Sequence, residues 1–247
     1  MTLLRVTSQG TGEPVVWLHG FTQTRYSAPE FLASLSHCNR VLTLDLPGHG
    51  EAAGVRADLV TTARLIAEAV EEEQFSLAGY SFGGRVALHL ALDVPHRIRR
   101  LVLVSATRGL ADPLERAARV SRDEALADHI EAVGTEIFLD EWLAQPLFAG
   151  AAELDRERRS RNAEGLAASL RLAGTGTQEF LGPRLGELTM PVLTLAGRRD
   201  EKFLAEARAI SAGVLEGRVE IIEGAGHALH LEQPAESVEL VSQFLSE

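Results

Sequence analysis

The chain of 247 residues carries 35 acidic side chains against 24 Lys and Arg, a net charge of −11, and 45% of its residues are hydrophobic. This is the composition of an ordinary globular protein, and its negative field repels nucleic acid and anionic membranes, so we expect neither as a partner. The single cysteine, Cys38, excludes an internal disulfide and a paired-thiolate metal site, and without a signal peptide or an apolar run of membrane-spanning length we predict a cytoplasmic protein with no membrane insertion.

Short apolar runs that end in Gly or a polar residue recur along the chain. Continuous apolar runs of this length are typical of strands covered on both faces, as in a parallel sheet. Helix-period stretches over 62–73 and 84–92 lie between some of them, which predicts βαβ units in a doubly wound, mostly parallel α/β sheet. The expected strands are Val15 to Leu18, Val41 to Leu46, Phe75 to Ala78, Leu101 to Ser105, Val192 to Ala196 and Val219 to Ile222.

The interval 107–188 breaks this alternation, because it is rich in Ala, Arg, Glu and Leu at helical spacing and contains no convincing strand. We expect a helical lid over the carboxyl ends of the strands, where an open α/β sheet keeps its ligand crevice. No repeat, low-complexity tract or Pro-rich linker sets this interval apart. Residues 1–247 are therefore predicted to form one domain, with the lid as an insertion.

A candidate nucleophile lies in Gly79-Tyr80-Ser81-Phe82-Gly83, between the expected strand 75–78 and the expected helix 84–92. The segment matches the G-x-S-x-G nucleophile elbow, in which the glycines permit a sharp turn and the serine projects above the sheet. The five-residue pattern alone is weak evidence. The strand, turn and helix around it make Ser81 a strong candidate.

The partners of such a serine follow in the chain as an acid and then a histidine. Asp200 and His227 each come shortly after a predicted strand, on the side where we expect the ligand. Three distant residues can converge there without being close in sequence. We interpret two other histidines, His49 and His230, as structural.

The dipeptide His19-Gly20 follows the first strong strand and precedes Phe21. This placement predicts that the backbone N–H groups of Phe21 and Phe82 form an oxyanion hole. The alternative is a plain tight turn.

With these residues, nearly the whole chain resembles the α/β-hydrolase superfamily, most of whose members are hydrolases. Three motifs narrow this resemblance to the succinyl-hydroxycyclohexadiene-carboxylate synthases of menaquinone biosynthesis, across essentially all of the sequence. The motifs are Gly79-Tyr80-Ser81-Phe82-Gly83-Gly84-Arg85, the segment from Phe138-Leu139-Asp140-Glu141-Trp142 to Gln145-Pro146-Leu147-Phe148, and Asp200-Glu201-Lys202-Phe203.

The resemblance implies a lyase that expels pyruvate from a cyclohexene substrate with three carboxylates. In that family the triad serine serves as a base and no acyl-enzyme forms. We expect no metal and no organic cofactor, because the chain has neither metal-ligand spacing nor a phosphate-binding motif. The substrate-binding residues that the resemblance implies are Tyr80, Arg85, Arg119, Trp142, Lys202 and a third arginine, placed at Arg159 with Arg161 as the alternative.

Physical chemistry favours the same basic cluster. A polycarboxylate that enters a protein of net charge −11 needs several cations in one pocket, and arginine binds carboxylates through two parallel hydrogen bonds. Arg85 lies one helical turn beyond Ser81, and Lys202 is the only lysine of the chain. For Arg119 a solvated helix face is the alternative, and for Trp142 a place in the lid core.

Our hypothesis is that His227, oriented by Asp200, deprotonates Ser81, whose alkoxide removes a ring proton and drives elimination of the enolpyruvyl group. Two other functions are compatible with the same triad: a carboxylester or C–C bond hydrolase acting through an acyl-enzyme, and a non-catalytic small-molecule receptor. Basic lid residues favour the lyase, because pockets for neutral esters are mainly apolar. The oligomeric state does not follow from the sequence.

Overall fold

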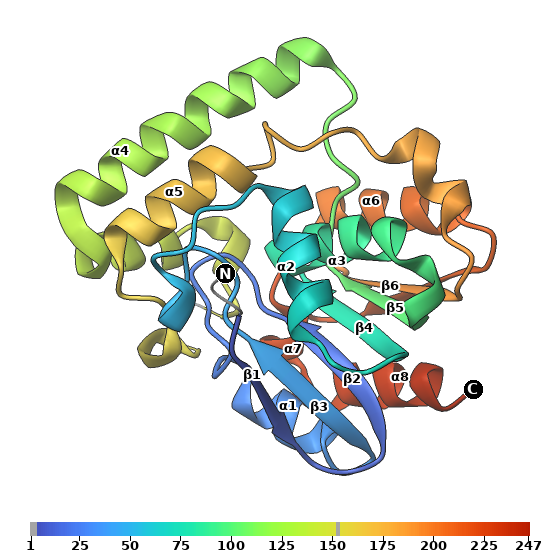
Figure 1. The fold of residues 1–247 in the computed structure, drawn as a ribbon. Helices are drawn as coiled ribbons and strands as arrows, with labels where there is room; N and C mark the ends of the chain where they lie inside the picture. Colours follow the sequence, from blue (N-terminus) through green and yellow to red (C-terminus); the bar gives the residue numbers. More distant parts are fainter. Residues whose placement is uncertain (1–3, 152–153) are drawn as a thin grey trace.

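A computed structural model describes residues 4–151 and 154–247. Within them, seven strands form one sheet in the order β1-β3-β2-β4-β5-β6-β7 (Figure 1). Only β1 runs antiparallel to its neighbour, β3, and the other neighbouring pairs are parallel. The strands are β1 (Val6–Gln9), β2 (Glu13–Leu18), β3 (Asn39–Leu44), β4 (Phe75–Tyr80), β5 (Ile98–Val104), β6 (Val192–Gly197) and β7 (Gly217–Ile222).

The predicted fold class is confirmed, with two differences at the edges of the sheet. The edge strand β1 was not predicted, because its four residues, two half-buried and two exposed, are too few for a hydrophobic pattern. The opposite edge, β7, is only partly buried, so the prediction of strands covered on both faces is wrong there. Its exposed side results from its place at the end of the strand order.

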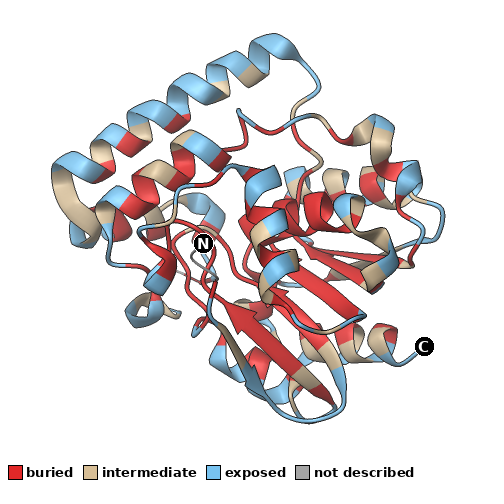
Figure 2. Ribbon diagram, in the orientation of Figure 1, coloured by how far each residue is buried: buried red, intermediate tan, exposed pale blue. Residues whose placement is uncertain are grey.

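Helices cover both faces of the sheet, and each face has its own core cluster. Figure 2 shows the buried strands between these layers. Helix α3 is buried along nearly its whole length, as its apolar composition requires. On one face lie α2 (Leu59–Ala69), α3 (Phe82–Asp93) and α6 (Glu201–Gly213), and on the other lie α1 (Pro29–Leu35), α7 (Leu229–Glu232) and α8 (Pro234–Ser246).

Helix α2 ends at Ala69, four residues before the predicted end at Glu73. Three consecutive glutamates follow, and negative charge is unfavourable at a helix C-terminus. Arg97 instead donates hydrogen bonds to the carbonyl oxygens of Ala67, Val70 and Glu72, which satisfies the last turn.

Between β5 and β6, the described residues of the interval 107–188 form helices and turns and no strand. Helices α4 (Pro113–Leu143) and α5 (Ala163–Ala173) lie side by side beyond the sheet (Figure 1) and share a small apolar core. Gly134 interrupts α4 with a positive φ of 77°. Three short 3-10 helices complete the interval: η3 (Pro146–Phe148), η4 (Arg156–Arg158) and η5 (Gly182–Glu187). We call this interval the lid.

In the part of the chain that the structure describes, no helix has both the length and the apolar composition that are needed to cross a bilayer.

Candidate active site

Ser81 stands at the turn between β4 and α3, where it is the N-cap of α3. Its backbone has φ 51° and ψ −104°, a strained conformation for a residue with a side chain. The turn is tight, because a Cβ on Gly79 would lie 2.4 Å from the carbonyl oxygen of Gly83. Glycine is therefore required at position 79, and the sharp turn directs Ser81 into a cavity under the lid.

The three predicted triad residues meet although they lie far apart in sequence. His227 Nδ1 is 2.7 Å from Asp200 Oδ2, and His227 Nε2 is 3.0 Å from Ser81 Oγ. Asp200 caps the N-terminus of α6, where its Oδ1 accepts a hydrogen bond from the Phe203 N–H at 3.3 Å. The Ser105 hydroxyl donates to the carbonyl oxygen of His227 at 2.8 Å, which holds the loop after β7 in place.

This geometry determines what Ser81 can do. With its proton on Nδ1, bonded to the buried carboxylate of Asp200, His227 presents Nε2 as an acceptor to the Ser81 hydroxyl. The hydroxyl can then lose its proton and act either as a nucleophile or as a base. The surrounding cavity must decide between these two roles.

The predicted oxyanion hole is supported by the hydrogen bonds around it. The N–H groups of Gly20 and Thr22 bond to neighbouring side chains at 2.8 and 3.3 Å, whereas the Phe21 N–H between them has no partner among the described residues. Phe82 is the first residue of α3, where N–H groups have no acceptor within the helix. Phe21 and Phe82 line the same cavity as Ser81.

The cavity has a volume of about 370 Å³, within the range of small-molecule sites, and residues of the sheet loops and of the lid line it. Of the eleven predicted site residues, ten line it, and the eleventh, Asp200, lies behind His227. The ten are Phe21, Tyr80, Ser81, Phe82, Arg85, Arg119, Trp142, Arg159, Lys202 and His227.

The cavity wall is strongly positive although the protein is negative. Five cationic side chains line it, and among the described lining residues Asp123 is the one acidic side chain. Such a concentration of positive charge in a protein of net charge −11 marks a site for an anion. The cations are Arg85, Arg119, Arg122, Arg159 and Lys202.

Arg85 is buried on α3, with no carboxylate bonded to it among the described residues. Its Nη1 donates to the carbonyl oxygen of Ala173 at 2.9 Å and lies 3.5 Å from Gln178 Oε1. Burial, together with the neighbouring charge of Arg119, lowers the pKa of Arg85 to about 9. An anionic ligand would relieve this cost, because it supplies the missing counter-charge.

The structure distinguishes the two candidates for the third arginine. Arg159 is buried, lines the cavity and donates from Nη1 to Thr22 Oγ1 at 2.5 Å. Arg161 is exposed, pairs with Glu136 and is not among the lining residues. Arg159 is therefore the one placed to reach a ligand.

The predicted aromatic and lysine positions lie on the rest of the wall. Trp142 packs on Phe138 at 5.7 Å between ring centroids, so it belongs to the lid core as well as to the cavity. Its Nε1 is buried without a partner among the described residues, which leaves a donor for a ligand. Burial raises the pKa of Tyr80 and keeps its phenol protonated. Lys202 lines the cavity from the exposed start of α6.

Comparison with known proteins agrees with this geometry. The family model described as "Alpha/beta hydrolase family" matches residues 15–240. The chain belongs to the alpha/beta hydrolase family. Within it, a Bacillus subtilis protein whose name provisionally assigns it as a 2-succinyl-6-hydroxy-2,4-cyclohexadiene-1-carboxylate synthase is 38% identical over 95% of this chain and 90% of its own length. A Photorhabdus laumondii synthase of the same name is 32% identical over 94% of this chain and 85% of its own.

Among solved structures, MenH from S. aureus matches this alpha/beta hydrolase with a TM-score of 0.92 and 30% identity, covering 100% of this chain and 98% of its own. The resemblance to the synthases that the sequence motifs indicated is thus confirmed.

Two charged residues of the cavity wall, Asp123 and Arg122, were not predicted as site residues of this alpha/beta hydrolase. Asp123 is buried and accepts a hydrogen bond from Arg119 Nε at 2.7 Å, which holds that guanidinium at the wall. Its position four residues after Arg119 on a helix was the available signal. Arg122, three residues after Arg119 on α4, lines the cavity as well.

The histidines interpreted as structural are buried. Burial lowers the pKa of His49 and of His230 to about 3. The ring of His230 packs against that of Tyr80 at 4.2 Å between centroids, with the ring planes tilted by 49°, and neither of its ring nitrogens has a partner among the described residues. Both imidazoles are therefore neutral in the folded protein at pH 7.

We expect this neutrality to make the fold sensitive to acid. The unfolded chain takes up a proton at His230 near pH 6.5 and the folded chain does not, so stability present above pH 6.5 is lost as the pH falls toward 3. From pH 7 to pH 5 this residue contributes a loss of about 2 kcal/mol. Urea unfolding of His230→Phe should show a pH dependence smaller by that amount, with little loss at pH 7. An unchanged pH dependence would contradict the expectation.

Proposed function

We propose that this chain is a 2-succinyl-6-hydroxy-2,4-cyclohexadiene-1-carboxylate synthase, a lyase of menaquinone biosynthesis. It eliminates pyruvate from 2-succinyl-5-enolpyruvyl-6-hydroxy-3-cyclohexene-1-carboxylate. The observation that carries the proposal is the combination, in one cavity, of a triad serine with five cationic side chains. Relatives at 32 and 38% identity bear the name of this synthase, which supports the same activity.

The charge of the wall fits a substrate with three carboxylates. Arginines bind carboxylates through charge-assisted hydrogen bonds, often in pairs. Arg85 and Arg119 lie on the side of the cavity formed by α3 and α4, and Arg159 bonds to Thr22, next to Phe21. Anionic groups at different ends of one molecule can therefore each meet a guanidinium.

The proposed mechanism uses Ser81 as the base. His227 takes the serine proton, and the alkoxide removes a proton from the ring of the substrate. The electron pair of that C–H bond forms a new ring double bond, the existing ring double bond shifts by one position, and the C–O bond to the enolpyruvyl group breaks. Pyruvate leaves as its enolate and takes up the proton that His227 received, while Ser81 keeps the ring proton, so the triad returns to its starting state. The N–H groups of Phe21 and Phe82 stabilise the negative charge that develops.

A hydrolase that forms an acyl-enzyme on Ser81 uses the same three residues. The cavity argues against it, because a neutral ester does not offset the desolvation of Arg85. An assembled triad with a 3.0 Å contact between His227 and Ser81 argues against a non-catalytic receptor.

One assay separates these functions. The purified protein is supplied with the cyclohexene substrate while pyruvate release is followed, and with a nitrophenyl ester in parallel. Pyruvate release supports the lyase. Ester turnover without pyruvate release indicates a hydrolase. If the protein shows neither activity, both enzymatic proposals are contradicted.

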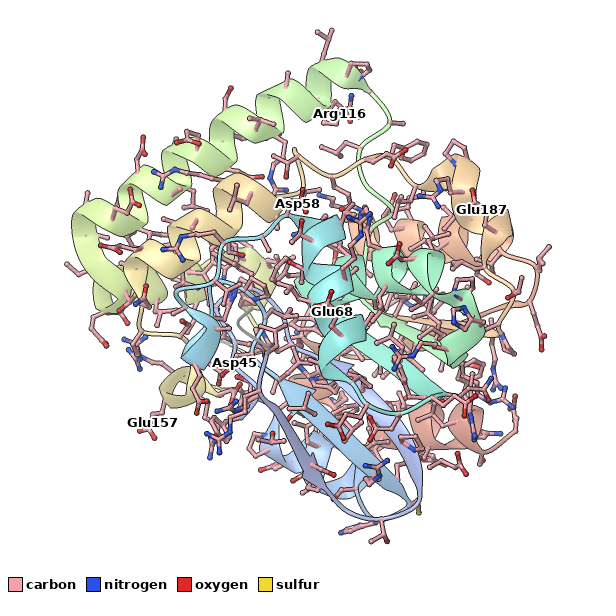
Figure 3. All side chains as sticks on the ribbon, viewed as in Figure 1. Asp45, Asp58, Glu68, Arg116, Glu157 and Glu187 are labelled. Carbon is pink, nitrogen blue, oxygen red and sulfur yellow. The ribbon has the colours of Figure 1, made fainter. Side chains whose placement is uncertain are left out.

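We expect Arg85→Met to raise KM by about 100-fold, because a charge-assisted hydrogen bond to the substrate is lost. The thermal midpoint should change little, since Arg85 is buried without an anionic partner among the described residues. Steady-state kinetics of pyruvate release measure the effect. Arg116→Met is the matched control: Arg116 lies on α4 (Figure 3) outside the cavity lining, so its KM should stay near the wild-type value. An unchanged KM in Arg85→Met would remove Arg85 from the site.

The remaining expectations stay predictions. In residues 4–151 and 154–247, no three His, Cys, Asp or Glu side chains gather as metal ligands would, and a mechanism without metal or cofactor is tested by activity after chelation and dialysis. Cell fractionation tests the cytoplasmic location. A small polycarboxylate is the proposed partner, and we expect neither nucleic-acid binding nor membrane insertion.

A further inference from the structure

Thr22, next to the Phe21 N–H, adopts a backbone conformation that its side chain disfavours. Its φ is 69°, in the left-handed region, which is an outlier for a β-branched residue. The Gln23 N–H donates to the Gly20 carbonyl oxygen at 3.1 Å, so residues 20–23 form a turn whose third residue needs a positive φ. A strained residue of this kind persists only when its surroundings hold it.

The conformation of Thr22 determines where the Phe21 N–H points. Closing the turn brings the Gln23 N–H to the Gly20 carbonyl oxygen, which His19 Nδ1 also contacts at 2.9 Å. That carbonyl belongs to the same planar peptide unit as the Phe21 N–H. Holding one end of the unit therefore orients the other, and the N–H is left without a partner among the described residues.

Each polar group of Thr22 is bonded to a different part of the molecule. Its N–H donates to His49 Nε2 at 3.3 Å, and its carbonyl oxygen accepts from the Ser160 N–H at 2.7 Å. Its hydroxyl oxygen accepts from Arg159 Nη1 at 2.5 Å. Two of these three bonds come from the lid, and one of the two comes from a cation of the cavity wall.

The bonds at Thr22 belong to a wider seam between lid residues 155–160 and residues 22–28. Thr24 Oγ1 donates to the Arg158 carbonyl oxygen at 2.6 Å, and the Ala28 N–H donates to Asp155 Oδ2 at 3.2 Å. On the other side, Asp45 Oδ1 accepts from the Arg25 N–H at 2.8 Å. Asp45, labelled in Figure 3, thus holds the same loop from the sheet.

We propose that Thr22 is a positioning residue that links Arg159 to the oxyanion hole, so that the position of the Arg159 guanidinium sets the alignment of the Phe21 N–H. The chemical link is the Thr22 hydroxyl. The benefit for the reaction rests on the proposed function. If Arg159 binds a carboxylate of the substrate, the link makes the alignment of the oxyanion hole depend on substrate binding. The link itself concerns only this chain.

The test uses a neutral fluorophosphonate: Ser81 Oγ bonds to phosphorus, the P–F bond breaks and fluoride leaves, and the phosphoryl oxygen occupies the oxyanion hole. This probe carries no carboxylate for Arg159 to bind, and the Thr22 substitutions separate an effect through the Thr22 hydroxyl from a direct contact between Arg159 and the probe. We expect Arg159→Met and Thr22→Val each to slow phosphonylation by about 30-fold, because both misalign one donor of the hole. Thr22→Ser keeps the acceptor oxygen and should stay within about threefold of wild type.

A double-mutant cycle separates this link from general destabilisation. In the Arg159→Met background, Thr22→Val should add less than about threefold, because the same hydrogen bond is already lost. Thr24→Val and Arg161→Met are the matched controls, since they alter the same seam and an arginine outside the cavity lining, and both should react at nearly the wild-type rate.

Two results would overturn the proposal: phosphonylation of Arg159→Met at the wild-type rate, or effects of the two substitutions that multiply. If Thr22→Val fails to fold, the phosphonylation rates of Arg159→Met and Thr22→Ser are sufficient to test the proposal. Absence of pyruvate release by the wild-type protein would contradict the proposed lyase activity. It would not affect the conclusion from the phosphonylation rates.

Discussion

Ser81→Ala should lower the rate of pyruvate release by at least about 10⁴-fold, because it removes the group that takes the ring proton. His227 Nε2 lies 3.0 Å from Ser81 Oγ, so the imidazole is placed to activate that oxygen. Stopped assays over hours measure the residual rate. The fold should be preserved, since an alanine fits wherever the serine does. Residual activity within about 10-fold of wild type would contradict the role of Ser81.

Ser81→Cys distinguishes a base from a nucleophile. A thiolate is a good nucleophile but a weaker base than an alkoxide. If Ser81 acts as a base, pyruvate release should be lost in this variant while the thiol still reacts with a nitrophenyl ester. Retained pyruvate release would instead point to a covalent intermediate on residue 81.

Asp200→Asn should lower kcat by about 10⁴-fold. The amide would donate to His227 Nδ1, which places the imidazole proton on Nε2 and leaves no acceptor for the Ser81 hydroxyl. The Oδ1 atom that accepts from the Phe203 N–H remains, so the cap of α6 should be kept and the thermal midpoint should shift little. Steady-state kinetics and thermal unfolding measure the two effects.

Asp58→Asn is the matched control for Asp200→Asn. Asp58 (Figure 3) caps α2 in the same way, accepting from the Thr61 N–H at 2.7 Å, but lies outside the cavity lining. Its kcat should stay at the wild-type level. A similar loss in both variants would mean that the effect comes from helix capping and not from the triad.

The sequence by itself was sufficient to predict the fold class and the triad, because these depend on local rules, whereas the basic and aromatic residues of the cavity wall followed from the resemblance to the synthases. Apolar runs predict strands, and the elbow around Ser81 requires glycines at fixed spacing. In a parallel sheet, the ends of strands meet at one edge, which brings Asp200 and His227 to Ser81. The edge strand β1 was not predicted, because a strand of four residues, two of them exposed, shows too little hydrophobic pattern.

Only the tertiary structure decided which lid residues reach the cavity. Arg159 and Arg161 are two positions apart and chemically equal, and the docking of lid residues 155–160 on the loop after β2 buries one and exposes the other. The same docking places Thr22 in hydrogen bonds with Arg159 and Ser160 of the lid, and no sequence pattern around Thr22 indicates them. Sequence periodicity reports the faces of single elements, whereas the bonds at this seam join segments more than a hundred residues apart.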